Sequence, residues 1–177
     1  MTASDNSLIA EACAGNRAAF EQLLERHYDM MFRVAYRFTG HRQDAEDIAQ
    51  DVCIGLAHKL ALFKGKSSFS SWLYRVVVNA CMDAHKHRAS TKRSEDGFVE
   101  LEAHTQAEAA EASQQLAWLY RAIHALEPDL KATALLVLSE EMSHAQAAEV
   151  LGCKESTISW RMHEIRKKLQ ASLKGAL

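Results

Sequence analysis

Apolar residues recur at spacings of three and four through residues 7–88, the pattern of amphipathic α-helices. A first run ends at Gly40, and Asp44 opens a second helix with Ala45, Ile48, Val52 and Leu56 on one face. A polar break, KGKSS, follows Phe63, and a further helix is predicted from about residue 69 to 87. The positions that repeat in the first run are Ala19, Phe20, Leu23, Leu24, Met31, Phe32, Ala35 and Tyr36.

Residues 113–177 show a second set of helical signals. Pro128 suits the first turn of a helix, where its missing N–H is not needed. Ser143 followed by Gln146 predicts a capping box. Gly152 is placed to end that helix in a left-handed conformation.

The stretch between these segments has weak periodicity and an acidic excess, which predicts a flexible linker. The predicted organisation is therefore a helical domain at 1–88, a linker at 89–112 and a second helical domain at 113–177. With only 7 glycines and one proline in 177 residues, we predict an all-α protein of two small domains. This composition argues against a turn-rich β-sandwich and against a Rossmann sheet.

No stretch approaches 18 consecutive apolar residues, and the N-terminus lacks a signal-peptide pattern, so we expect a cytoplasmic protein without membrane insertion. The four cysteines are far apart and form no C-x-x-C pair. In a reducing compartment we interpret them as small buried apolar residues.

The net charge of −2 is unusual for a DNA-binding protein, but the charges are unevenly distributed. Residues 88–115 carry 3 basic and 6 acidic groups, whereas residues 152–177 carry six basic groups against two glutamates. The basic character is therefore local to the C-terminal end.

Residues 144–169 have the spacing of a helix-turn-helix. Ala148 allows close helix approach, Gly152 makes the turn, and Ile158 locks the second helix onto the first. The second helix buries Ile158, Met162, Ile165 and Leu169, which leaves an outer face able to enter a major groove. That face carries Ser156, Ser159, Trp160, His163 and Lys167, flanked by Arg161, Arg166 and Lys168.

Two alternatives stay open for this segment. A helix pair with a glycine turn also occurs as a plain helical hairpin, although the basic, aromatic outer face disfavours it. Trp160 either contacts a phosphate or a thymine methyl group, or packs on the third helix of its domain.

The loop after Phe63 combines cations, hydroxyl groups and aromatic residues. Opening a DNA duplex costs about 1.4 kcal/mol per stacked step, and a protein offsets this by holding extruded bases and the backbone. Lys64, Lys66 and the neighbouring serines suit such contacts, whereas Phe69 and Trp72 are explained better as core residues.

Three ordered segments resemble the extracytoplasmic-function group of sigma factors. They are DAEDIAQDV (44–52), FKGKSSFSSWLYRVVVNACMD (63–83) and LEPDLKATALLVL…SHAQAAEVLGCKESTISWRMHEIRKKL near the C-terminus. The resemblance covers nearly the whole chain and implies a non-enzymatic subunit that directs core RNA polymerase to promoters, without a cofactor. It also implies regulation by an anti-sigma factor.

The resemblance implies a role for each segment. The helix from residue 44 would bind the clamp coiled coil of the polymerase β′ subunit through Asp44, Asp47, Gln50 and Asp51. The −10 element would be recognised and melted by Lys64, Lys66, Ser67, Ser68, Phe69, Trp72, Arg75 and Asn79. The −35 element would be bound by Ser156, Thr157, Ser159, Trp160, Arg161, His163, Arg166 and Lys167, in a domain that also contacts the β flap.

The chain departs from the group's pattern near the recognition helix. Cys153-Lys154 and Ser156 replace the usual apolar–Pro pair and glycine, and Ser159-Trp160 replaces Lys-Ser. These differences leave the −35 sequence open.

Four other functions can be weighed against this one. Cys81, His85 and His87 lie close together near a helix end, but no fourth ligand is evident and a basic helix end explains them more simply, so we predict no metal site. No catalytic or nucleotide-binding motif of a protease, kinase or oxidoreductase is present.

The main rival is a stand-alone helix-turn-helix regulator, which binds its operator alone, usually as a dimer. A purely protein-binding helical scaffold is a further alternative, and it would have no salt-dependent DNA affinity.

Overall fold

The computed structural model describes residues 4–91 and 118–174, and the chain divides into two compact units between Arg88 and Ala89. Within the described ranges all regular structure is helical and no strand occurs, which confirms the predicted all-α class. None of these helices is both long and apolar enough to span a bilayer. The predicted linker lies, from residue 92 onward, outside the described residues.

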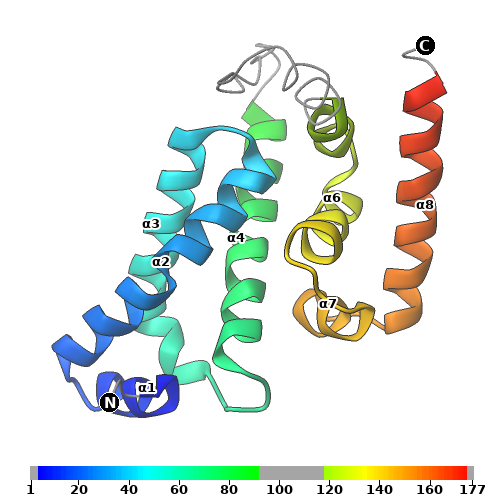
Figure 1. The fold of residues 1–177 in the computed structure, drawn as a ribbon. Coiled ribbons are helices and arrows are strands. Elements are labelled where there is room, and N and C mark those ends of the chain that lie inside the picture. Colours follow the sequence, from blue (N-terminus) through cyan, green and yellow to red (C-terminus); the bar gives the residue numbers. More distant parts are fainter. Residues whose placement is uncertain (1–3, 92–117, 175–177) are drawn as a thin grey trace, which may run out of the picture. The chain divides into compact units, whose positions relative to one another are not determined.

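The first unit is a small helical bundle (Figure 1). Helix α1 packs against α2 and against the short turn η1, and α2 packs along α3. The elements are α1 (Asp5–Cys13), α2 (Arg17–Thr39), α3 (Arg42–Lys59), the 3-10 turn η1 (Leu60–Leu62) and α4 (Phe69–Thr91).

Local sequence accounts for the helix boundaries of this unit. The Asn16 side chain caps α2 by accepting a hydrogen bond from the Ala19 N–H. Gly40 ends α2, as predicted, and its φ of 75° lies in the left-handed region that favours glycine. Helix α3 begins at Arg42, two residues before the predicted Asp44.

The predicted stripe of α3 lies in the core of the first unit, whereas that of α2 is only partly buried: Ala19, Leu23, Met31 and Ala35 are buried, but Phe20, Leu24 and Phe32 are half-buried and Tyr36 is exposed. Ala45, Ile48, Val52 and Leu56 of α3 are all buried. The largest fully buried side chains of this unit are Leu23, Met31, Leu56, Leu73, Val77 and Cys81. Burial of this stripe leaves the opposite face of α3 to solvent.

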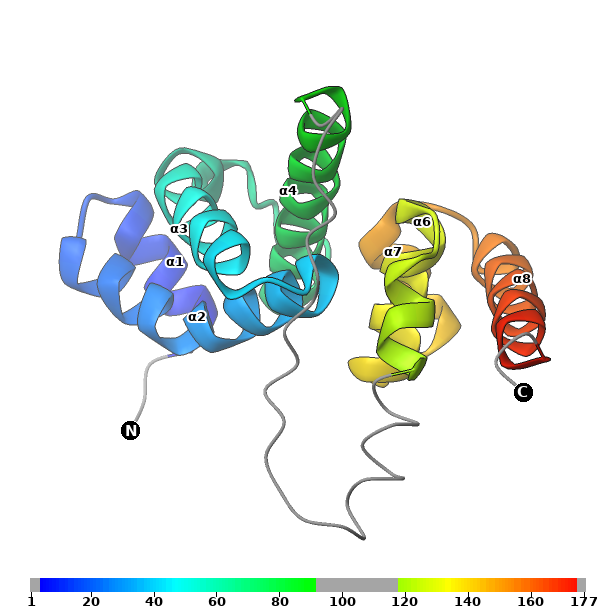
Figure 2. The same ribbon diagram turned by 90° about the horizontal axis from the view of Figure 1, so that it is seen from above.

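The described part of the second unit starts with a helical segment at residues 118–124 and continues through α6, α7 and α8 (Figure 2). Helix α8 packs on both α6 and α7. The elements are α6 (Pro128–Ala134), the π-helical turn η2 (Leu135–Ser139), α7 (His144–Leu151) and α8 (Glu155–Lys174).

Three sequence predictions in this unit are confirmed. Pro128 lies in the first turn of α6, Ser143 and Gln146 form a capping box at α7, and Gly152 ends α7 with φ 64°. The π-helical turn was not predicted. It is followed by Glu141, whose φ of 53° is the one positive value at a non-glycine residue among the described residues.

Gly152 and Glu141 allow a matched test of backbone strain. A Cβ atom at Gly152 would meet nothing within 4 Å, so Gly152→Ala should destabilise the second unit through its backbone alone, by about 1 kcal/mol. Glu141→Gly removes a side chain from the same backbone region and should not lower stability. Urea unfolding followed by circular dichroism measures both, and a wild-type midpoint for Gly152→Ala would contradict this account.

Candidate nucleic-acid interface

Helices α7 and α8 form the predicted helix-turn-helix of the second unit. Ile158, Met162 and Ile165 are buried, as predicted, whereas Leu169 is only half-buried. All the residues predicted for the outer face of α8 are exposed, namely Ser156, Ser159, Trp160, His163 and Lys167. The buried stripe of α8 therefore orients this face toward solvent.

Trp160 is the most unusual residue of this face because 61% of it is exposed. That exposure disfavours the alternative in which its ring packs on another helix of the unit. A large apolar ring is thus presented among small polar side chains, and such a ring can make van der Waals contact with a thymine methyl group.

A hydrogen bond joins the two helices of the motif at the same face. His144 Nδ1 lies 3.0 Å from Ser159 Oγ, so the first turn of α7 contacts the outer face of α8. His144 directly follows the capping residue Ser143, which fixes the start of α7. This bond limits the freedom of Ser159 beside Trp160.

Two cations of α8 are engaged within the unit. The Arg161 side chain is 17% exposed, and its Nη2 lies 3.2 Å from Asp129 Oδ2 of α6. Lys168 Nζ lies 2.8 Å from Glu127 Oε1 and, as the main cause, lowers the pKa of that carboxyl. Arg161, which was predicted to flank the outer face, therefore fastens α8 to α6.

The remaining predicted residues of α8 are placed differently. Thr157 is half-buried, whereas Arg166 is exposed. Arg166 and Lys167 thus place positive charge near the exposed face, and such side chains commonly contact DNA phosphates.

In the first unit, the lysine–serine loop is closed at its base by aromatic rings. The ring centroids of Phe63 and Phe69 lie 5.5 Å apart in an edge-to-face arrangement, and Trp72 lies 5.5 Å from Phe63 and 5.7 Å from Phe69. Phe69 is buried and Trp72 half-buried. These positions agree with the core interpretation of the two aromatic residues.

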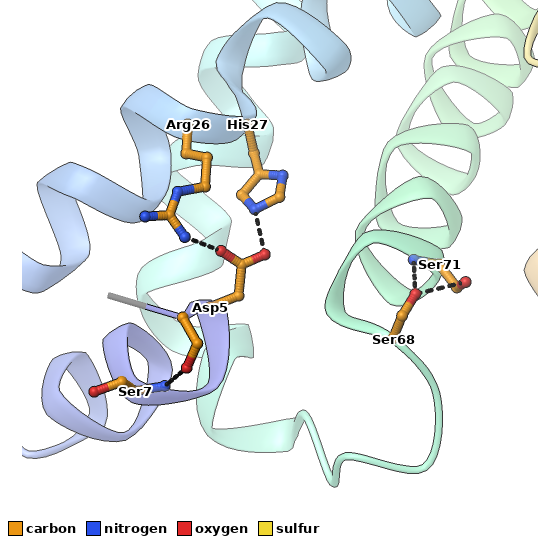
Figure 3. Close-up of polar contacts among 7 residues, drawn as sticks. Asp5, Ser7, Arg26, His27, Ser68 and Ser71 are labelled. Carbon is orange, nitrogen blue, oxygen red and sulfur yellow. Dashed lines mark hydrogen bonds and ion pairs between the residues drawn. The ribbon is translucent and has the colours of Figure 1, made fainter. Parts of the chain in front are cut away.

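The lysines of the loop are exposed, whereas the Ser68 side chain forms a hydrogen bond within the protein. Lys64 and Lys66 are exposed on either side of Gly65, whose φ is 66°. Ser68 Oγ accepts a hydrogen bond from the Ser71 N–H at 3.0 Å, so Ser68 caps α4 (Figure 3). Ser67 is half-buried.

Beyond the loop, α4 carries a polar strip. Arg75, Asn79 and Asp83 are exposed and spaced by four residues, so they lie on one side of α4. The loop and this strip follow one another along the chain, which gives a continuous path of cationic and amide groups.

The predicted polymerase-binding residues of α3 divide into two groups. Asp47, Gln50 and Asp51 are exposed. Asp44 instead forms an ion pair with Arg88 of α4, and the hydrogen bond that Arg88 donates to Asp44 raises the pKa of Arg88. Asp44 therefore joins the start of α3 to α4, a role that its place in the sequence did not reveal.

Ile54 is a residue of this face that the sequence analysis missed. It is 70% exposed and follows Asp47, Gln50 and Asp51 at helical spacing. The sequence feature that could have identified it is its position, because this isoleucine lies outside the buried stripe of α3. The face is thus acidic with an exposed apolar side chain.

Of the four cysteines interpreted as buried residues, only Cys81 is buried, whereas Cys13 is exposed and Cys53 and Cys153 are half-buried. Burial raises the pKa of the Cys81 thiol to about 12, far above the range in which a thiolate binds metal or reacts with oxidants. Among the described residues, no group of three or more histidine, cysteine, aspartate or glutamate side chains is arranged to hold a metal ion.

Comparison with known proteins assigns the two units to one family. The family described as Sigma-70 region 2 matches residues 23–91, and Sigma-70, region 4 matches residues 116–169. The ECF RNA polymerase sigma factor SigM of Mycobacterium tuberculosis is 34% identical, over 98% of this chain and 86% of its own length. RNA polymerase sigma factor NccH of Alcaligenes xylosoxydans xylosoxydans is 28% identical, over 97% of this chain and 96% of its own.

Two solved structures are similar over most of the chain, each at 26% identity. CnrH in complex with the cytosolic domain of CnrY has a TM-score of 0.68 and covers 97% of both chains. The sigma factor RpoE of Bartonella quintana, in complex with the anti-sigma factor NepR, has a TM-score of 0.65 and covers 88% of this chain and 96% of its own.

The contact of Arg161 with Asp129 predicts a structural role that can be separated from DNA binding. Arg161→Ala should destabilise the second unit by about 1 kcal/mol, since the pair is partly solvent-exposed. Lys167→Ala should leave stability unchanged because Lys167 is exposed on the outer face. A double-mutant cycle with Asp129→Ala measures the coupling, and additive losses would refute the pairing.

Proposed function

Because the chain belongs to the extracytoplasmic-function group of the sigma-70 family, we propose that its two units bind separate promoter elements while both are attached to core RNA polymerase. The chain is an RNA polymerase sigma factor that directs promoter-specific initiation. The observation that carries the proposal is the presence of a distinct polar surface on each unit, a loop with a cationic rim on the first and an exposed recognition face on the second.

The chain would act in the cytoplasm and catalyse no reaction itself, since the polymerase performs the chemistry. An anti-sigma factor is the expected regulator. Support for this partner comes from the two similar solved structures, in which CnrH is bound to CnrY and RpoE to the anti-sigma factor NepR.

The outer face of α3 is the proposed contact with the polymerase clamp. Asp47, Gln50 and Asp51 would face a basic coiled coil of the β′ subunit, and Ile54 would add apolar contact at the centre of the interface. Asp44 is assigned to the Arg88 pair instead. The second unit would rest on the β flap.

The loop at residues 64–68 is the proposed device for opening the −10 element. Lys64 and Lys66 can hold the phosphates of an unpaired strand, while Arg75 and Asn79 continue the path along α4. Phe63 and Phe69 close the base of the loop, and Trp72 extends this aromatic group. Binding energy gained only with the opened strand would offset the loss of base stacking.

The exposed face of α8 is the proposed −35 reader. Ser156, Ser159 and His163 can form hydrogen bonds with base edges in the major groove, and Trp160 can contact a thymine methyl group. Arg166 and Lys167 would contact the backbone and set the orientation of the helix.

Removing the loop cations should impair opening without impairing assembly. Lys64→Ala with Lys66→Ala should slow open-complex formation by about tenfold, or 1.4 kcal/mol, because two contacts with the unpaired strand are lost. Permanganate reactivity of unpaired thymines measures opening, and fluorescence anisotropy measures affinity for core polymerase.

A charge-matched control is Arg17→Ala with Lys59→Ala, which removes two exposed cations of the same unit that are not part of the loop. Equal loss of opening in the control, or parallel loss of polymerase affinity in the loop variant, would refute the assignment of the loop.

The exposed ring of Trp160 predicts a sensitivity to thymine methyl groups. Trp160→Ala should reduce −35-dependent transcription by about fourfold, since burial of one methyl group contributes about 0.8 kcal/mol. Replacing each −35 thymine in turn by deoxyuridine should weaken the wild type at one position and leave the variant unaffected there. If no position distinguishes the two proteins in run-off transcription, Trp160 does not read a methyl group.

A further inference from the structure

Asp5, in the first turn of α1, makes two polar contacts with α2. Its Oδ1 lies 2.5 Å from Arg26 Nη1 and its Oδ2 lies 2.9 Å from His27 Nε2 (Figure 3). The carboxylate therefore holds two neighbouring side chains of α2 at once. The partner residues are 21 and 22 positions away along the chain, so these are tertiary contacts.

His27 is the buried member of this group, with 9% of its surface exposed. A buried ring N–H requires an acceptor, and Asp5 supplies it. Because the bond fixes one ring nitrogen at 2.9 Å from a carboxylate, it also fixes the orientation of the imidazole plane.

The other contact of His27 leads to the proposed opening loop. Its ring lies 5.2 Å from Phe69, edge to face at 72°. Phe69 in turn packs against Phe63, and only residues 64–68 separate the two phenylalanines. The position of Phe69 thus sets one end of the loop that carries Lys64 and Lys66.

Helix α1 lies outside the segment that matches Sigma-70 region 2, which begins at residue 23. It is attached to the unit through Leu8 and Ile9, which are buried, and through the contacts of Asp5. The polar attachment, through Asp5, includes His27, whose ring packs against Phe69.

We propose that Asp5 and His27 are positioning residues for promoter opening, through which α1 holds the base of the 64–68 loop. This inference rests on the proposed role of that loop. Asp5 acts on DNA through His27 and Phe69 and touches no nucleotide itself. A purely stabilising α1 would instead affect every activity of the first unit together.

The first experiment detects the brace in the protein alone. Of the chain's three tryptophans, Trp72 is left as the sole one by Trp118→Phe and Trp160→Phe, so its emission reports on the rings at the loop base. Asp5→Ala should increase acrylamide quenching of Trp72 by about twofold, because His27 loses its fixed orientation. Glu11→Ala is the matched control: Glu11 is also a carboxylate of α1, but it bonds to Ser7 and Asn16. It should leave quenching unchanged.

The second experiment tests the consequence for function with holoenzyme. Asp5→Ala should slow opening of a duplex promoter by about tenfold and should not change the affinity of the chain for core polymerase. On a promoter whose −10 element is mismatched and already open, the transcription rate should fall by less than about twofold, since no stacking must then be broken. Combined with Lys64→Ala and Lys66→Ala, Asp5→Ala should add little further loss, because both changes act on one loop. Asp5→Asn, which keeps an acceptor, should restore part of the rate.

The outcomes separate this inference from the role of the loop. If the lysine variant is impaired but Asp5→Ala behaves like Glu11→Ala, the loop assignment stands and the brace is refuted. Equal loss on duplex and open promoters, loss of polymerase affinity, or losses that multiply with the lysine changes also overturn the brace. An unimpaired lysine variant overturns the role of the loop, and this inference with it.

Discussion

Burial of one apolar stripe on each helix is the constraint on which the functional surfaces depend. A helix has one orientation that buries its stripe, and this orientation determines which side chains remain in solvent. On α8, burial of Ile158, Met162 and Ile165 directs Trp160 outward. On α3, the stripe through Val52 and Leu56 leaves Ile54 and the acidic residues exposed. The surfaces proposed for DNA and polymerase are therefore consequences of core packing.

Polar contacts within each unit engage some of the side chains that were predicted to bind DNA or polymerase. Asp44 pairs with Arg88, Arg161 with Asp129, and Ser68 caps α4. Each of these residues has the chemistry of a binding residue but is engaged within its own unit. Asp47 and Lys167, in contrast, are exposed. The same kind of contact, between Asp5 and His27, reaches the base of the opening loop.

Local signals account for the parts of the fold that were predicted. Pro128, the Ser143–Gln146 capping box and Gly152 act through their own backbone geometry, so their consequences follow from a few neighbouring residues. The turn between α1 and α2 and the π-helical turn η2 were not predicted, and the positive φ of Glu141 contradicts the usual preference for glycine. The partners of Asp44, Arg161 and His27 lie 44, 32 and 22 residues away, so periodicity could not reveal them. The residue assignments at the DNA and polymerase surfaces stay predictions.

Cooperation with the polymerase is the central claim. The chain carries a net charge of −2 and its basic excess is local to residues 152–177, so we expect it to bind DNA weakly without the polymerase. Quantitative footprinting on one promoter, with the chain alone and with core polymerase at the same salt concentration, tests this most directly. The account predicts protection of the −35 and −10 elements only when core polymerase is present. Equal, sequence-specific protection by the chain alone would contradict it.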